Sequence, residues 1–224
     1  MRSPKVNTKR ARREASIERL LDAAQRLFVS QGYRQTNLDQ IASAADLTKG
    51  AVYFYFRSKE TVLLELLMRV QAIVVDEALK VAASAGPRAT GKLVAFLHHQ
   101  SKLGVTHRDA VLLLILMSLE FSERKGAVRN LLRRVYRRLY GFVERLIRDG
   151  QRSGEIRTDV RSRELSAIVM AIHDGTFLEW YRRSPALSGP EVVRALRSVL
   201  LTGVAGRPTY APAGAARRGQ ARAA

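Results

Sequence analysis

The chain has 224 residues, of which 39 are lysine or arginine and 20 are aspartate or glutamate, giving a formal net charge of +19. This balance favours a polyanionic partner such as nucleic acid, with a cationic surface that serves only solubility as the alternative. The absence of cysteine excludes disulfides and thiolate metal sites, and it fits a reducing cytoplasm. The longest apolar run, residues 110–117, is shorter than the roughly 18 residues of a membrane span. We therefore expect a cytoplasmic protein with no membrane partner.

The N-terminal residues 1–13 carry six basic side chains and no acidic or aromatic one. This composition predicts a flexible basic arm in free solution. From Glu14 the apolar residues follow a helical period up to Gly32, which stands where a helix C-cap belongs. We therefore expect a first helix over residues 14–32.

The segment 38–56 contains two short helical patterns separated by a tight break. Thr36 or Asn37 is placed to cap the first helix, and Thr48 to cap the second. The side chains expected to face inward are Leu38, Ile41, Ala42 and Ala45 in the first helix and Leu47, Val52 and Phe56 in the second. The pattern predicts a helix-turn-helix, whose second helix has the size that a DNA major groove admits.

Helical patterns continue through the rest of the chain. Ser58 and Thr61 are spaced as the start of a fourth helix, which is expected to run to about Ala85, before a break at Gly86-Pro87. Further amphipathic helices are expected near 89–104, 109–122, 125–150, 162–183 and 189–203. Because strand-like alternation is nowhere sustained, we predict an all-α fold.

These residues resemble the TetR family of bacterial transcriptional regulators. The family's N-terminal signature is matched, in order and spacing, by Gly32-Tyr33, Thr36, Ile41-Ala42, the run Gly50-Ala51-Val52-Tyr53-Phe54-Tyr55-Phe56, and Lys59-Glu60. The clearest departure is Asp46 at the turn, where family members usually have glycine. Since aspartate is among the few other residues that tolerate a left-handed backbone, we expect the turn to be kept.

The resemblance implies a helix-turn-helix DNA-binding domain (14–74) and a helical ligand-binding and dimerisation domain (75–205). They follow the basic flexible arm (1–13) and precede residues 206–224, whose Gly, Pro, Ala and Arg composition predicts a disordered basic tail. The resemblance also implies a homodimer whose two heads bind a near-palindromic double-stranded DNA operator and leave it when a small-molecule effector binds. Two recognition helices fit successive major grooves only when about 34–36 Å apart. The segment 62–75 is the expected lever between effector and head.

Within this motif, Lys49 and the amides of its helical turn are expected to contact phosphate, and Tyr53 and Tyr55 to offer hydroxyls to the DNA backbone. The candidate DNA contacts are Arg34, Thr36, Asn37, Thr48, Lys49, Gly50, Ala51, Tyr53, Tyr55 and Lys59. Four of them have a structural alternative: Tyr53 as a packing residue, Thr36 and Asn37 as caps, and Lys59 as a solvated charge. For Phe54, a contact with DNA and packing within the head both remain open.

The effector candidates lie in the helical body. They are Met117, Phe121, Arg137, Tyr140, Met170, His173, Asp174 and Phe177. His173 and Asp174 offer polar groups for a largely apolar pocket, with a dimer-interface pair or a satisfied core pair as an at least equal alternative. Gly175, in the middle of a helix, suggests a close helix approach at the dimer seam.

The segment 124–148 carries nine basic residues and one acid, Glu144. Most of these arginines are expected to form a solvated helix face. The sharper hypothesis is that some of Arg133, Arg134, Arg137 and Arg138 bind an anionic effector such as a phosphorylated or acyl-thioester compound, since guanidinium groups match phosphate geometry. The effector is thus expected to be anionic or hydrophobic.

No enzyme site is expected. The run Gly86 to Lys92 matches part of a phosphate-binding loop, but Leu93 stands where serine or threonine must meet magnesium. The four histidines lack metal-ligand spacing, and neither a cofactor nor a metal is expected. The chain is therefore interpreted as a ligand-responsive repressor. The alternative is an architectural protein that binds nucleic acid nonspecifically through its charge, with little sequence preference and steep salt dependence.

Overall fold

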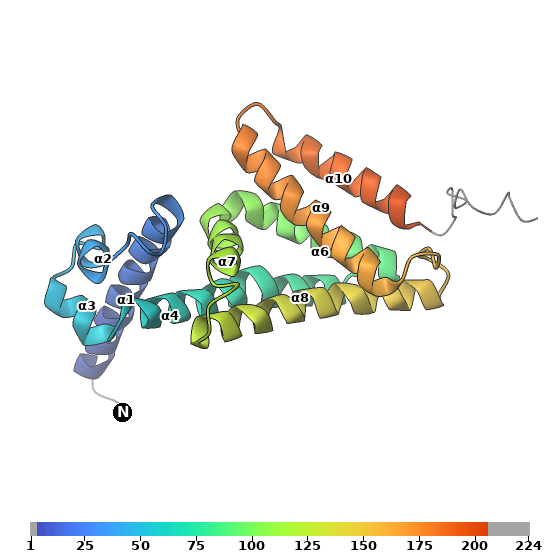
Figure 1. Ribbon diagram of the computed structural model, residues 1–224. Coiled ribbons are helices and arrows are strands. Elements are labelled where there is room, and N and C mark those ends of the chain that lie inside the picture. The colour runs from blue at the N-terminus through green and yellow to red at the C-terminus, as the bar shows by residue number, and fades with distance from the viewer. Residues whose placement is uncertain (1–3, 206–224) are drawn as a thin grey trace, which may run out of the picture. The chain divides into compact units, whose positions relative to one another are not determined.

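The computed structural model describes residues 4–205, and side chains from Lys9 onward. These residues form helices joined by short loops (Figure 1), apart from an isolated bridge between Ile156 and Ala205. The all-α prediction is thereby confirmed. The basic tail predicted for residues 206–224 lies outside the described residues. No helix in the described part of the chain combines the length and apolar character needed to cross a membrane.

The described residues fall into two compact units. The first comprises residues 4–81 and 98–139, and the second comprises residues 82–97 and 140–205. The helix-turn-helix lies in the first unit. Most of the expected effector contacts lie in the second.

The head of the first unit consists of α1 (Pro4–Ser30), α2 (Leu38–Ala44) and α3 (Lys49–Tyr55), with α2 packed against both others. Its core buries Leu20, Leu21, Phe28, Ile41, Val52 and Phe56. The first helix begins at Pro4 and not at Glu14, so residues 4–13, expected as a flexible arm, are helical here. Proline suits the first position of a helix, and Arg10 pairs with Glu14 one turn later, with Nε and Oε1 2.8 Å apart.

Side-chain caps define the boundaries of the three helices that follow α1. Asn37 caps α2 in a reciprocal capping box with Gln40, which decides between Asn37 and Thr36. The Thr48 hydroxyl accepts from the amide of Ala51 at 3.2 Å, and Ser58 forms a capping box with Thr61 at the start of α4 (Lys59–Gln71). The caps predicted from Thr48 and from Ser58 with Thr61 are confirmed.

Asp46 occupies the turn between α2 and α3 with a φ of 50°, as expected from its tolerance of the left-handed region. Arg19 of α1 donates to the carbonyl of Asp46 at 3.1 Å and also to that of Ala45. The turn is therefore held by a side chain from α1 as well as by its own backbone.

The fourth helix is not continuous to Ala85 as expected. A π-helix (Ala72–Asp76), labelled η1, follows α4 and is succeeded by α5 (Glu77–Ala83). The buried amide of Gln100 donates to the carbonyl of Val74 at 3.1 Å, and Asp76 lies 2.6 Å from Arg138. The wider turn of the π-helix is thus held by side chains from other helices of the same unit. The spacing of apolar residues along one helix cannot predict such contacts.

The remaining helices are α6 (Ala89–Thr106), α7 (Arg108–Glu120), α8 (Ala127–Arg152), α9 (Ser162–Arg183) and α10 (Gly189–Val204), close to the predicted bounds. In the first unit α7 packs against α1 and α4. In the second unit α9 and α10 lie side by side (Figure 1). Glu155 caps the N-terminus of α6, where its Oε2 accepts hydrogen bonds from the amide and the hydroxyl of Thr90 at 3.1 and 2.7 Å.

Candidate DNA-binding surface and effector residues

The helix α3 is anchored on one side and open on the other. Val52 is fully buried and Phe56 is 7% exposed, whereas Tyr53 is 50% and Phe54 is 78% exposed. Lys49 and Gly50 share the open side, and Ala51 and Tyr55 are half-buried at its edges. The arrangement leaves a solvent-facing surface of the kind that enters a major groove.

Lys49 is held at this surface by an acidic neighbour from α2. Its Nζ lies 2.7 Å from Asp39 Oδ2, and this hydrogen bond raises the pKa of Lys49. The ammonium also lies 6.0 Å from the centre of the Tyr53 ring. Lys49 is therefore cationic at neutral pH, but one acidic side chain competes with phosphate for it. Sequence reasoning missed Asp39, because only the folded turn brings it to Lys49.

Thr36 and Lys59, two of the candidate DNA contacts, instead stabilise the head from within. Thr36 is 1% exposed, and its hydroxyl donates to the Gly32 carbonyl at 2.8 Å. The Lys59 ammonium donates to the carbonyls of Tyr33 and Thr36, both at 2.6 Å, and lies 4.3 Å from the centre of the Tyr33 ring. Burial lowers the pKa of Lys59. Both side chains therefore hydrogen-bond to carbonyls of the loop between α1 and α2. For Lys59, neither of the two expected roles, a phosphate contact or a solvated charge, included these hydrogen bonds.

Arg34 is engaged with α7. Its Nε donates to Glu120 at 2.8 Å, and Glu120 also accepts from Arg124. Phe121, an expected effector contact, packs its ring against Tyr33 at 5.1 Å between centroids. Asn37 remains exposed, but its side-chain oxygen serves the cap of α2.

The effector candidates are divided between the two compact units. The first unit contains Met117, Phe121 and Arg137, and the second contains Tyr140, Met170, His173, Asp174 and Phe177. Met117 and Met170 are each 2% exposed, whereas Arg137 is exposed. The eight residues therefore do not form one cluster within either unit.

A polar cluster does form in the second unit. His173, 8% exposed, has its Nδ1 2.9 Å from Asp174 Oδ1, and its ring lies 6.3 Å from that of Phe96. Burial, and secondarily the charge of Asp174, raises the pKa of Tyr140. Three of the predicted effector residues, Tyr140, His173 and Asp174, thus lie in one neighbourhood, which also contains the apolar ring of Phe96.

The arginines of α8 have unequal environments. Arg133, Arg134, Arg137 and Arg138 are all exposed, but Arg138 Nη1 lies 2.6 Å from Asp76 Oδ1. The first three are thus available to solvent or to an anion, and the fourth is occupied.

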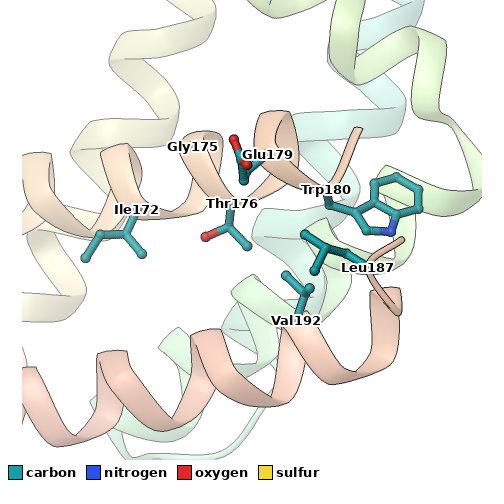
Figure 2. Close-up of a pocket in the computed structure, with 7 residues that line it drawn as sticks. All are labelled: Ile172, Gly175, Thr176, Glu179, Trp180, Leu187 and Val192. Carbon is teal, nitrogen blue, oxygen red and sulfur yellow. The ribbon is translucent and has the colours of Figure 1, made fainter. Parts of the chain in front are cut away.

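The second unit also has an open hollow of about 360 Å³ between α9 and α10. Figure 2 shows Ile172, Gly175, Thr176, Glu179 and Trp180 along α9, Val192 on α10, and Leu187 between them. Within residues 4–205, no group of three or more metal-ligating side chains is placed to hold a metal ion. None of the eight predicted effector contacts lines this hollow.

Comparison with known proteins identifies both parts of the chain. Residues 20–66 match the model of bacterial regulatory proteins of the tetR family, and residues 90–205 match that of the BetI-type transcriptional repressor C-terminal domain. The crystal structure of the MbdR regulator from Azoarcus sp. CIB is 48% identical, covers 84% of this chain and 98% of that chain, and has a TM-score of 0.77.

More distant proteins share the same architecture. The transcriptional regulator AcrR of Shigella flexneri is 26% identical over 165 residues, which are 73% of this chain and 77% of that protein. FadR from Bacillus subtilis, solved in complex with stearoyl-CoA, is 20% identical, covers 83% of this chain and 98% of its own, and has a TM-score of 0.69. The two family models and the MbdR match favour a regulator over both an enzyme and a nonspecific architectural protein. Together with the capped helix-turn-helix, they show that the chain belongs to the TetR family of DNA-binding transcriptional regulators.

Proposed function

We propose that this regulator is a cytoplasmic repressor that binds a near-palindromic operator as a homodimer and is released from it by a small-molecule effector. The observation that carries the proposal is the open face of α3, where Lys49 and Tyr53 are exposed while Val52 and Phe56 anchor the helix. The functional division that we propose is a DNA-binding domain over residues 14–74 and a ligand-binding and dimerisation domain over residues 75–205.

On this face we assign contacts by chemistry. Lys49 and the Tyr53 hydroxyl bind phosphate, and Tyr55 and Thr48 add hydroxyls at the rim. Gly50 and Ala51 are small enough to let the helix approach base edges closely. Asn37 and Arg34 are exposed and are proposed as peripheral contacts. We propose no DNA contact for the side chains of Thr36 and Lys59, because their polar groups are hydrogen-bonded inside the head.

The exposed apolar side of α9 and α10 supports the homodimer. Ile168 is 51% and Val199 is 63% exposed. A Cβ added at Gly175 would meet no heavy atom of the described residues within 4 Å outside its own helix backbone, so no close approach within residues 4–205 explains a glycine there. We infer that a second copy covers this side, and that the pair sets the two heads about one helical turn of DNA apart.

For the effector we propose a hydrophobic compound whose polar group is bound by His173 and Asp174 in the second unit. Independently, we propose that the exposed arginines of α8 in the first unit bind an anionic group. The stearoyl-CoA of Bacillus subtilis FadR combines both properties and is a suitable probe. Release of bound DNA by stearoyl-CoA should weaken in the Arg133→Gln, Arg134→Gln, Arg137→Gln variant. If release occurs with unchanged potency in this variant, these arginines have no role in it.

The central test is selection of bound sequences from a random duplex pool at near-physiological salt. A homodimer with specific heads yields an inverted repeat bound at least about 10³-fold more tightly than unrelated duplex. Recovery of no consensus, together with a steep salt dependence common to all sequences, would refute specific operator recognition.

A further inference from the structure

Phe54 is an apolar side chain that the folded head does not use. It is 78% exposed, more than any other large hydrophobic side chain among residues 9–205. Its neighbours along the chain differ, since Val52 is fully buried and Phe56 nearly so. Phe54 therefore contributes little to the core, and its position on α3 calls for another explanation.

The ring projects from the open face in a defined position. Phe54 follows Gly50 by four residues, so both lie on one side of the helix, and helical side chains lean toward the preceding turn. A Cβ added at Gly50 would meet only the Thr48 hydroxyl, at 3.9 Å. The ring of Tyr55 stands edge-on to that of Phe54, with centroids 5.1 Å apart and planes 77° apart. The result is an oriented aromatic ring beside an uncovered stretch of helix.

The chemistry of this position differs from that of its neighbours. Lys49 and Tyr53 carry groups that hydrogen-bond to phosphate, whereas a phenyl ring has neither donor nor acceptor. Among the groups that base pairs display in the major groove, the thymine C5-methyl is the apolar one. A phenyl ring on a helix that enters this groove is therefore matched to that methyl group.

We propose that Phe54 packs against the C5-methyl group of a thymine in each operator half-site, and so makes thymine required at that position. The inference rests on the proposed function, because it needs α3 to lie in the major groove. It goes further by naming a base and the atom through which that base is recognised.

The test uses the duplex recovered by selection with the intact protein. Each thymine in turn is replaced by deoxyuridine, which removes the methyl group and keeps the hydrogen-bonding edge, symmetrically in both half-sites. Affinity is measured for the wild type, for Phe54→Ala and for Tyr53→Phe, which keeps an aromatic ring at the neighbouring position. Because Phe54 is exposed, Phe54→Ala is expected to fold normally, which thermal unfolding checks.

We expect one thymine whose replacement weakens wild-type binding by about fourfold per half-site, as for the burial of one methyl group. The same replacement should have no effect on binding by Phe54→Ala and an undiminished effect on binding by Tyr53→Phe. This comparison measures the coupling between Phe54 and the thymine methyl group separately from other contacts. Equal binding of every deoxyuridine duplex, or an equal loss in Phe54→Ala, would overturn the inference while leaving specific operator recognition intact. Absence of any selected sequence would instead refute the proposed function, and this inference with it.

Discussion

Arg34 Nε donates a 2.8 Å hydrogen bond to Glu120, which ties the loop after α1 to the last turn of α7. Glu120 also accepts from Arg124, and the Tyr33 ring packs edge-on against Phe121 in the same place. Because this loop leads directly into α2, we propose that these contacts would transmit a displacement of α7 to the helix-turn-helix, beside the lever expected in the segment 62–75.

Replacing Glu120 with Gln should lower the free energy of unfolding by no more than about 1 kcal/mol at pH 7, since Arg34 is largely exposed. The hydrogen bond from Arg34 is the main cause that holds the pKa of Glu120 below its ordinary value of 4.5. The carboxylate's contribution is therefore complete above about pH 4.5 and is lost as the pH falls through the lower folded-state pKa. Urea unfolding of wild type and variant should accordingly converge toward acidic pH.

The exposed neighbour Glu123 offers a matched control for this measurement. Glu123→Gln removes the same charge and should leave the unfolding free energy almost unchanged. An equal loss in both variants, or a difference for Glu120→Gln that does not shrink with acid, would contradict the role of the Arg34 pair.

Lys59 and Lys49 should have different roles, Lys59 in the stability of the head and Lys49 in DNA binding. Lys59→Met leaves the carbonyls of Tyr33 and Thr36 without their donor and should cost about 1–3 kcal/mol of unfolding free energy. Lys49→Met should leave stability unchanged and reduce by about one the slope of log affinity against log salt concentration. Chemical unfolding and DNA titrations at several salt concentrations measure the two effects, and the reverse assignment would refute this division.

Asp39 should restrain DNA binding through Lys49. Asp39→Asn removes the carboxylate 2.7 Å from the Lys49 ammonium and one negative charge near the phosphates. We expect affinity for duplex DNA to rise several-fold at low salt, with a smaller gain at high salt because screening weakens both effects. Asp149→Asn, an exposed change on α8, provides the control, and a loss of affinity in Asp39→Asn would show that Asp39 orients Lys49 productively.

The sequence predicted the helices and caps well because these depend on local chemistry. Thr48 and Ser58 cap the helices that they were expected to cap, and Asp46 adopts the left-handed backbone. It did not predict that Lys59 binds loop carbonyls from residues 23 and 26 positions earlier, or that Gln100 and Arg138 fix the π-helix. Those contacts join segments distant in the chain, so no periodicity encodes them. The effector residues were harder still, because packing and ligand binding require the same apolar side chains.

Gly175 offers a test of the proposed homodimer. A Cβ added here meets no heavy atom of the described residues within 4 Å, whereas a leucine side chain would intrude on a second copy packed against α9. Gly175→Leu should therefore preserve helical content while shifting sedimentation from dimer toward monomer. Glu65→Leu, which places the same side chain on the exposed surface of α4, should leave the dimer intact. If Gly175→Leu also remains a dimer, the dimer interface does not include the surface around Gly175.

The most direct test of operator recognition by α3 compares the wild type with the Lys49→Ala, Tyr53→Ala variant. Affinities are measured for the selected duplex and for a scrambled duplex of equal composition, with Lys102→Ala of α6 as a control for lost charge. We predict that the double variant loses most of its preference for the selected duplex while Lys102→Ala keeps it. A double variant that still prefers the selected duplex as strongly as the wild type would show that another surface recognises the sequence.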